Sequence, residues 1–274
     1  MKGLRNVALF LYANLETGIA PVSFLMEEIM NQKEAKAVME VRFKEFRNKT
    51  QIGFTTKMTG KMFGMCSLST SPLVNPRCAD RAKDPNSVCH RCFSRTTMEY
   101  RKICAEKFGI NGNVLSDHVI PVNEWPVILK SAYPEIRIEA FGDVINVIHV
   151  INYFNLCKRN PKITFTAWTK NIDLYEAAVK MGHEKPDNLI LIASSSMLNK
   201  EINVEKHSIV DKIFTVYTFE YIKENNIQPD FINCGARSCK KCGRCYHKED
   251  GVENIREILK QDARKVQKFW EKQK

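Results

Sequence analysis

The chain has 274 residues, of which 44% are hydrophobic, and a formal net charge of +11 at pH 7. This length and apolar content suit one α/β barrel-sized domain with a substantial core. No apolar run is long enough for a membrane-spanning helix, and residues 1–15 lack a clean signal-peptide cleavage pattern, so we expect a cytoplasmic protein and no membrane partner.

The N-terminal part of the chain has no strong pattern. Residues 1–60 read as a mixed segment with a short apolar run at 7–12 and helix-like sequence around 22–47. Residues 61–100 are rich in Ser, Pro, Asn and Cys, which predicts a functional loop rather than a packed element.

From residue 136 onward, strand-like and helix-like stretches alternate. The predicted strands are 136–141, 162–168, 188–194 and 212–218, and the predicted helices are 144–157, 172–182 and 219–225. This alternation is typical of βαβ units and a parallel sheet. We therefore predict an α/β fold, a full or partial (β/α) barrel over 61–233, with a cysteine-rich loop at 66–92 and a cysteine-rich segment with a helix at 234–274. Both cysteine-rich segments would then meet at one face of the barrel.

Polar residues follow each predicted strand. Ligand groups in parallel sheets lie at the carboxyl ends of the strands, which makes these residues candidates for a site. Ser, Thr and Asp just after a strand are also common helix N-caps, so capping alone is an alternative explanation for them. The candidates are Asp143, Thr169, Lys170, Ser194, Ser195, Ser196 and Tyr217.

Seven of the ten cysteines fall into two groups, and Cys66, Cys104 and Cys157 stand apart. Disulfides need an oxidising compartment, which nothing in the sequence indicates. Closely spaced cysteines in an intracellular protein are typical of metal or redox chemistry. The groups are Cys78, Cys89 and Cys92, then Cys234, Cys239, Cys242 and Cys245.

The C-terminal group has the spacing C-x4-C-x2-C-x2-C in the segment CGARSCKKCGRCYH. Structural zinc sites usually combine two separated C-x-x-C pairs. A C-x2-C-x2-C run with a fourth cysteine nearby favours a 4Fe-4S cluster instead. Zinc, and less readily redox chemistry or a disulfide, remain alternatives because thiolates bind several soft metals.

The first group offers three cysteines, with ten residues between Cys78 and Cys89. Three thiolates could hold a cluster with one iron lacking a protein ligand, which leaves a coordination position for a substrate or cofactor. A zinc site completed by His90 or Cys66 is the alternative.

Basic residues surround both groups. Residues 75–108 have a net charge of +4 and residues 234–274 a net charge of +6. These charges either compensate the thiolates or bind a polyanion such as nucleic acid or a phosphorylated substrate.

Residues 61–246 resemble the phage "gene product eighty-eight" family. The matching features are Ser67-Leu68, Cys78, Cys89-His-Arg-Cys92-Phe93, Arg137 to Asp143, Trp168-Thr169-Lys170, the strand from Asn188, and the final cysteine run. The chain has Cys92-Phe93-Ser94 where that family usually has Cys-Tyr-Ala. The resemblance implies a protein of the host cytoplasm.

More remotely, the chain is similar to radical S-adenosylmethionine barrel enzymes, although those use C-x3-C-x2-C. This similarity implies that Cys78, Cys89 and Cys92 hold a cluster whose open iron binds S-adenosylmethionine. Asp143 and Lys170 would act in catalysis, and the four C-terminal cysteines would hold an auxiliary cluster. Cofactor contacts would come from Gly142, Asp143, Thr169, Lys170, Ser194, Ser195 and Ser196. The competing prediction is a zinc- or cluster-stabilised nucleic-acid-binding protein without catalysis.

Overall fold

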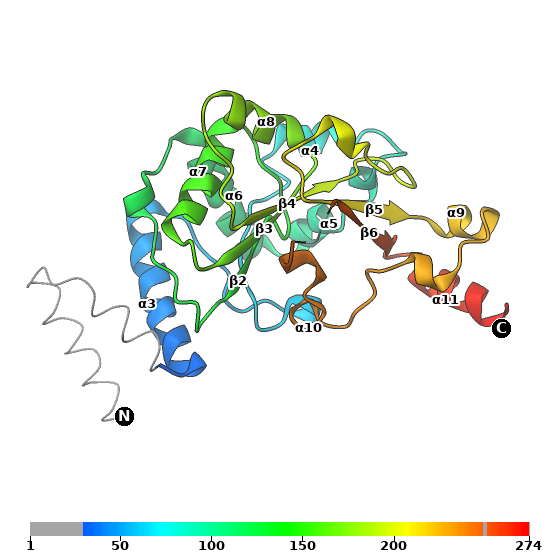
Figure 1. Ribbon diagram of the computed structural model, residues 1–274, viewed down its shortest axis with the longest axis horizontal. Helices are drawn as coiled ribbons and strands as arrows, with labels where there is room; N and C mark the ends of the chain where they lie inside the picture. The colour runs from blue at the N-terminus through cyan, green and yellow to red at the C-terminus, as the bar shows by residue number, and fades with distance from the viewer. Residues whose placement is uncertain (1–29, 249–250, 274) are drawn as a thin grey trace, which may run out of the picture.

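The computed structural model describes residues 30–248 and 251–273, and it has an α/β fold around one six-stranded sheet (Figure 1). All neighbouring strands are parallel, and their order along the sheet is their order along the chain, with β1 and β6 at the edges. The strands are β1 (Cys66–Leu68), β2 (Glu135–Ile138), β3 (Thr164–Thr169), β4 (Leu189–Ser194), β5 (Lys212–Tyr217) and β6 (Glu253–Ile258).

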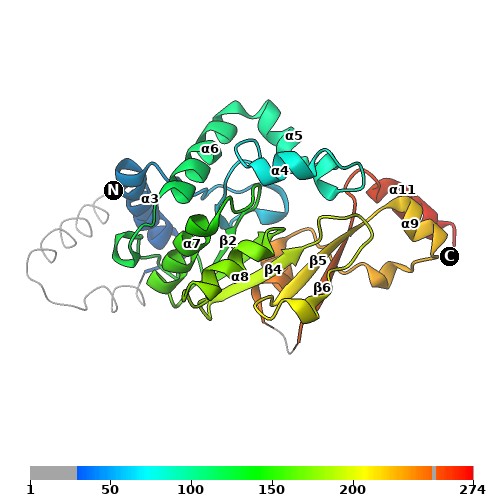
Figure 2. The same cartoon turned by 90° about the horizontal axis from the view of Figure 1, so that it is seen from above.

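Helices connect and flank these strands. Three of them, α4, α5 and α6, lie in the long connection between β1 and β2 and run close together along one side of the molecule (Figure 2). The helices are α3 (Gln32–Thr50), α4 (Pro76–Arg81), α5 (Phe93–Tyr100), α6 (Lys102–Asp117), α7 (Val147–Arg159), α8 (Ile172–Lys180), α9 (Phe219–Glu224), α10 (Cys239–Cys242) and α11 (Ala263–Glu271), with short 3-10 turns η1 (Gly60–Met62), η2 (Val88–Arg91) and η6 (Arg244–Tyr246).

Different segments of the chain pack on the two faces of the sheet. Alternate strand residues point to opposite faces. Phe165 and Ala167 of β3 belong to the main core with α7 and α8, whereas Trp168 belongs to a second cluster that includes Cys234 and Cys245. Figure 1 accordingly shows α7 and α8 on one side of the sheet and α10 on the other. The C-terminal cysteines thus pack on the face that these two helices leave uncovered.

The strand and helix predictions between residues 136 and 225 are confirmed in position, with shifted ends. The strand predicted to reach residue 141 ends at Ile138 because Glu139 adopts a left-handed backbone with φ of 56°. Such a conformation is rare for a residue with a side chain, and it breaks the strand. The Glu139 N–H still donates to the Leu68 carbonyl, 2.9 Å away, which holds the end of β2 against β1.

Two expectations about the cysteine-rich regions were incomplete. The stretch 61–100, predicted as a loop, contains the fully buried strand β1 and helices α4 and α5. The segment 234–274 contributes β6, so the sheet continues across the predicted boundary at 233 and 234. The predicted boundary between residues 60 and 61 is likewise not a structural one. Helix α3 lies in the predicted segment 1–60, yet its buried residues join the main core.

Helix α3 lies within the stretch 22–47 that the sequence marks as helix-like. Asn31 caps it through a capping box with Glu34, which fixes its start at Gln32. The apolar run 7–12 and the predicted helical residues 22–29 lie outside the described residues. Among the helices of the described part of the chain, none combines the length and the apolar character needed to cross a membrane.

Candidate metal centres

The first cysteine group lies in the long connection after β1, on three separate short elements. Cys78 is in the middle of α4, Cys89 is in η2, and the Cys92 sulfur accepts a hydrogen bond from the Arg95 N–H at the start of α5. Local helix geometry cannot bring the three together, so contacts with the rest of the fold must position them.

Helix α4 is fixed to the carboxyl end of β3. The Arg77 Nη1 donates to Asp173 at 2.8 Å, and the Arg81 Nη2 donates to the Lys170 carbonyl at 3.1 Å. The same Arg81 nitrogen donates to the Asn171 Oδ1 at 2.5 Å. Bonds from guanidinium groups to carboxylates are among the stronger hydrogen bonds in proteins, so α4 and Cys78 are held beside the residues that follow β3.

The segment that carries Cys89 is fixed to the carboxyl end of β4. The Ser87 hydroxyl and the Val88 N–H both donate to the Ser196 carbonyl, at 2.9 and 2.8 Å. The Leu198 N–H returns a bond to the Asn86 carbonyl at 3.1 Å. The three-cysteine connection therefore spans the ends of β3 and β4, where two of the predicted polar sets lie.

The three sulfurs share one electrostatic environment with Asp143 and Lys170. Burial raises the pKa of the Cys78 thiol above its ordinary value, and the charges of Asp143, Cys89 and Cys92 raise this pKa further. The Lys170 ammonium group acts in the opposite direction. The charges of Cys89 and Cys92 thus reach the Cys78 thiol, and a shared metal site of the three cysteines stays a prediction.

Arg81 is a residue of this site that the sequence did not indicate. It lies one turn after Cys78 on α4, so the two side chains share a helix face. Its Nη1 atom is buried and has no hydrogen-bond partner. An unpaired buried guanidinium nitrogen is unfavourable unless it meets an anion, and a thiolate-bound cluster or a ligand carboxylate would supply one.

The Asp143 carboxylate already has several donors. Its oxygens accept hydrogen bonds from the Thr169 hydroxyl at 2.7 Å, the Lys170 N–H at 2.8 Å and the Val144 N–H at 2.8 Å. The side chain is almost fully buried, and burial raises its pKa while these donors and Lys170 oppose the shift. Asp143 therefore ties the loop after β2 to the end of β3.

Gly142 has a packing role in the same loop. A Cβ atom at this position would lie 2.2 Å from the Thr70 Oγ1 and 2.6 Å from the Thr70 carbonyl oxygen. Only glycine permits such close backbone approach. The loops after β1 and β2 are thus in direct contact at Gly142.

The three predicted serines play different roles. Ser194 and Ser195 are buried, and the Ser195 hydroxyl bonds with the backbone of Met197. Ser196 contributes its carbonyl to the cysteine connection, as described above. Tyr217 donates to Glu201 at 2.7 Å and packs in a separate cluster near α9 and α11.

The second cysteine group covers the sheet face opposite α7 and α8. The Cys234 N–H donates to the Arg256 carbonyl of β6, and the Thr166 hydroxyl of β3 donates to the Cys245 carbonyl, both at 3.0 Å. Between these anchors, α10 carries Cys239 and Cys242. Gly243 then adopts φ of 69°, which allows the chain to reverse toward Cys245.

Three basic side chains surround this group, and two of them, Arg137 and Lys61, lie outside the basic segment 234–274 that the sequence analysis describes. Arg137 of β2 lowers the pKa values of Cys239 and Cys245, and Lys61 lowers that of Cys234. Arg244 interacts with Cys242 and with Glu253. Burial is the larger effect and raises the pKa of Cys234 to about 11 and that of Cys245 to about 12.

Two buried polar atoms beside this group have no hydrogen-bond partner, namely the Arg137 Nε and the Tyr246 hydroxyl. Both side chains lie near the Trp168 ring. The Arg137 guanidinium is 3.4 Å from the centre of that ring, and the centre of the Tyr246 ring is 6.5 Å from it. Both unpaired atoms are hydrogen-bond donors. They suit a site that receives an anionic group.

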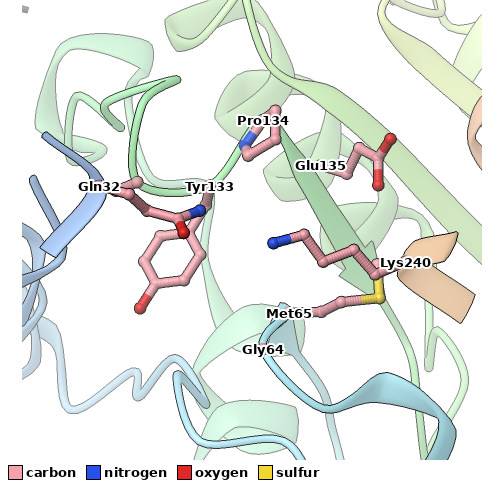
Figure 3. Close-up of a pocket in the computed structure, with 8 residues that line it drawn as sticks. Gln32, Gly64, Met65, Tyr133, Pro134, Glu135 and Lys240 are labelled. Carbon is pink, nitrogen blue, oxygen red and sulfur yellow. The ribbon is translucent and has the colours of Figure 1, made fainter. Parts of the chain in front are cut away.

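The two cysteine groups contact different parts of the sheet. Figure 3 shows Lys240 of α10 near Met65, which directly precedes β1, and near Glu135, the first residue of β2. The three-cysteine connection instead lies at the carboxyl ends of β3 and β4. The expectation from the sequence that both segments meet at one face of the barrel is therefore wrong.

The remaining cysteines and His90 make no visible contribution to either group. Cys66 is buried in β1 and Cys157 in α7, and the His90 Nδ1 is 2.9 Å from the Ala82 carbonyl. All ten cysteines are free of disulfides. Within residues 30–248 and 251–273, no three His, Cys, Asp or Glu side chains are arranged around a single metal-ion position. No protein-family model, curated protein or solved structure with which the chain was compared matches it.

Proposed function

We propose that this chain is an iron–sulfur protein of radical S-adenosylmethionine-like type, built on a partial (β/α) barrel. The consecutive order of six parallel strands supports the barrel assignment, because open and closed (β/α) barrels share that order. The cysteine spacing and the resemblance noted in the sequence support the iron assignment.

One observation carries the proposal. Cys78 and Cys89 come from two elements that are each fixed to a strand end, where parallel sheets place their reactive groups, and Cys92 lies three residues after Cys89. The charges of Cys89 and Cys92 act on the Cys78 thiol. A locally folded zinc knuckle would not need these anchors. This arrangement supports a site that faces a ligand at the carboxyl edge of the sheet.

In this proposal Cys78, Cys89 and Cys92 would hold a 4Fe-4S cluster and leave one position for S-adenosylmethionine. Once reduced by an external one-electron donor, the bound cluster would supply the electron for cleavage of that cofactor. Lys170 and Arg81 provide positive charge for the cofactor carboxylate. Asp143 acts as a positioning residue rather than as a catalytic residue and cofactor contact, because its oxygens already accept three hydrogen bonds.

The four C-terminal cysteines hold a second, fully ligated 4Fe-4S cluster. Four thiolates and a doubly charged cluster core leave a net charge of about −2. Lys61, Arg137 and Arg244 offset this charge in a partly buried environment. The unpaired Arg137 Nε and Tyr246 hydroxyl would then donate toward the cluster or its ligands.

Anaerobic purification followed by metal analysis tests the proposal. We expect a brown protein with about eight irons per chain, from about four in each cluster. The reduced protein should bind S-adenosylmethionine in a calorimetric titration. A colourless protein with stoichiometric zinc would refute the iron assignment. A brown protein that does not bind S-adenosylmethionine would refute the radical S-adenosylmethionine-like assignment.

A nucleic-acid-binding protein stabilised by zinc or a cluster, without catalysis, is the second candidate. The charge distribution favours it, since residues 75–108 and 234–274 carry +10 of the +11 net charge. Strong salt-dependent binding of nucleic acid, without binding of S-adenosylmethionine, would support this candidate.

A further inference from the structure

The outer surface of α5 exposes large side chains that the fold does not use. Phe93 and Tyr100 are 53% and 83% exposed and lie seven residues apart, which places them on the same helix face two turns apart. Ile103, at the start of α6, is 85% exposed. Met98 faces the interior and anchors the helix, so the exposure of the others is not a sign of a loose element.

Basic side chains surround these rings. Arg91, Arg95, Arg101 and Lys102 are all exposed. The only acidic residue between positions 91 and 103 is Glu99, which pairs with Arg95 at 3.5 Å. No carboxylate of the described residues lies within ion-pair distance of the other three. From the other end of the sequence, the Lys260 ammonium lies 3.6 Å from the centre of the Phe93 ring.

We propose that this surface, called the α5 face, binds single-stranded nucleic acid. It consists of Arg91, Phe93, Arg95, Tyr100, Arg101, Lys102, Ile103 and Lys260. Exposed aromatic rings stack on unpaired bases, and nearby arginines and lysines contact the phosphates. Duplex bases are already stacked on each other, so exposed rings favour a single strand.

Cys92, the N-cap of α5, lies between Arg91 and Phe93 of the α5 face. A strand bound there would pass beside Cys92, which makes nucleic acid the substrate class we infer for the proposed enzyme. The binding itself needs no iron, because every residue of the face is an exposed side chain of η2, α5, α6, the residue between these two helices or the turn after β6. If the protein holds no iron, binding of single-stranded nucleic acid to the α5 face can therefore still be tested separately.

The test measures binding of fluorescently labelled oligothymidylate and of a matched duplex to the full chain, by anisotropy at several salt concentrations. Tyr100→Ala should weaken binding of the single strand at least about fivefold, the lower end of the range for one stacked base. A plot of log affinity against log salt has a negative slope. The double variant Arg101→Glu/Lys102→Glu should reduce the magnitude of this slope by about 1.4, because two phosphate contacts are lost. Acidic residues in the first turn suit the helix dipole, so α6 should still form.

Two controls match these variants elsewhere on the surface. Phe63→Ala removes a ring that is 77% exposed beside the other cysteine group, and Lys44→Glu/Lys49→Glu makes the same charge change on α3. Neither control should change the affinity by more than about twofold. Equal losses in variant and control, no loss with Tyr100→Ala, tighter binding to the duplex, or binding only to phosphatidylserine vesicles would each overturn the proposal.

Discussion

Arg137 and Trp168 form a close cation–π pair, with the guanidinium carbon 3.4 Å from the ring centre. The two residues come from adjacent strands and lie on the sheet face that the C-terminal cysteines cover. Partial burial strengthens such a pair, because less water competes for the cation. Trp168 thus holds the Arg137 charge in place beside Cys239 and Cys245.

Replacing Arg137 should weaken metal retention in the four-cysteine group. Arg137→Met removes the charge that favours the thiolates, and loss of a supporting residue near a metal typically costs about 10–100-fold in affinity. Arg137→Lys keeps the charge without the planar contact and should have an intermediate effect. The measurement is the rate of iron loss to a chelator under anaerobic conditions, with the exposed Arg264→Met as control. Identical rates for Arg137→Met and Arg264→Met would remove the electrostatic role.

Gly142→Ala should destabilise the protein by about 3 kcal/mol or more, at the upper end of the range for overpacking. The added methyl group would collide with the backbone of Thr70, which cannot move without shifting the loop after β1. Gly235→Ala is the matched control, since a Cβ there meets no atom within 4 Å. Chemical denaturation of the two variants makes the comparison, and equal stabilities would show that the two loops separate easily.

The sequence was sufficient to predict the central part of the sheet, for a physical reason. Strand β4 is a continuous apolar run buried on both faces, and β3 is rich in aromatic and β-branched residues, so pattern and length identify them. Strand β1 has only three residues, within a stretch rich in polar and cysteine residues. Strand β6, ENIREI, lies at the sheet edge and has only two apolar residues, so no strand pattern marks it in the sequence.

The polar environment of the sites could not be predicted in the same way. The cysteines identify themselves by spacing, but Arg81 and Arg137 look like ordinary surface arginines in the sequence. Their importance comes from contacts with residues far along the chain, namely Asn171 and Trp168. Asp143 was correctly placed after a strand, yet only the structure shows which donors occupy its carboxylate.

The two cysteine groups should lose metal independently. Cys89→Ala should abolish binding of S-adenosylmethionine and leave about four irons, while Cys242→Ala should lose the other cluster and lower stability. The reason is that the groups contact different parts of the sheet and each has its own cations. Iron counts and circular dichroism on both variants make the measurement. If either substitution alone removes all iron from a folded protein, the two-cluster arrangement is incorrect.

Glu139 directly follows β2 and carries a buried carboxyl group. Its side chain is fully buried and accepts hydrogen bonds from the Tyr153 hydroxyl at 2.5 Å and the Thr70 N–H at 3.0 Å. Burial raises its pKa to about 7, although these donors oppose the shift. The nearby His149 provides no compensating charge, because burial lowers its pKa to about 3.

The stability of the protein should therefore decrease as the pH rises through the window between the two pKa values of Glu139. In the unfolded chain this carboxyl titrates near pH 4.3, and in the folded chain near 7, so the folded state binds more protons in between. The loss over the whole window is at most about 4 kcal/mol. Glu139→Gln cannot ionise, so the stability of the wild type relative to this variant should fall by up to that amount between pH 5 and pH 8. Urea denaturation at several pH values measures it, with the exposed Glu205→Gln as the control for removing one charge. A wild-type advantage that stays constant over this range would mean that Glu139 is already ionised at pH 5 in the folded protein.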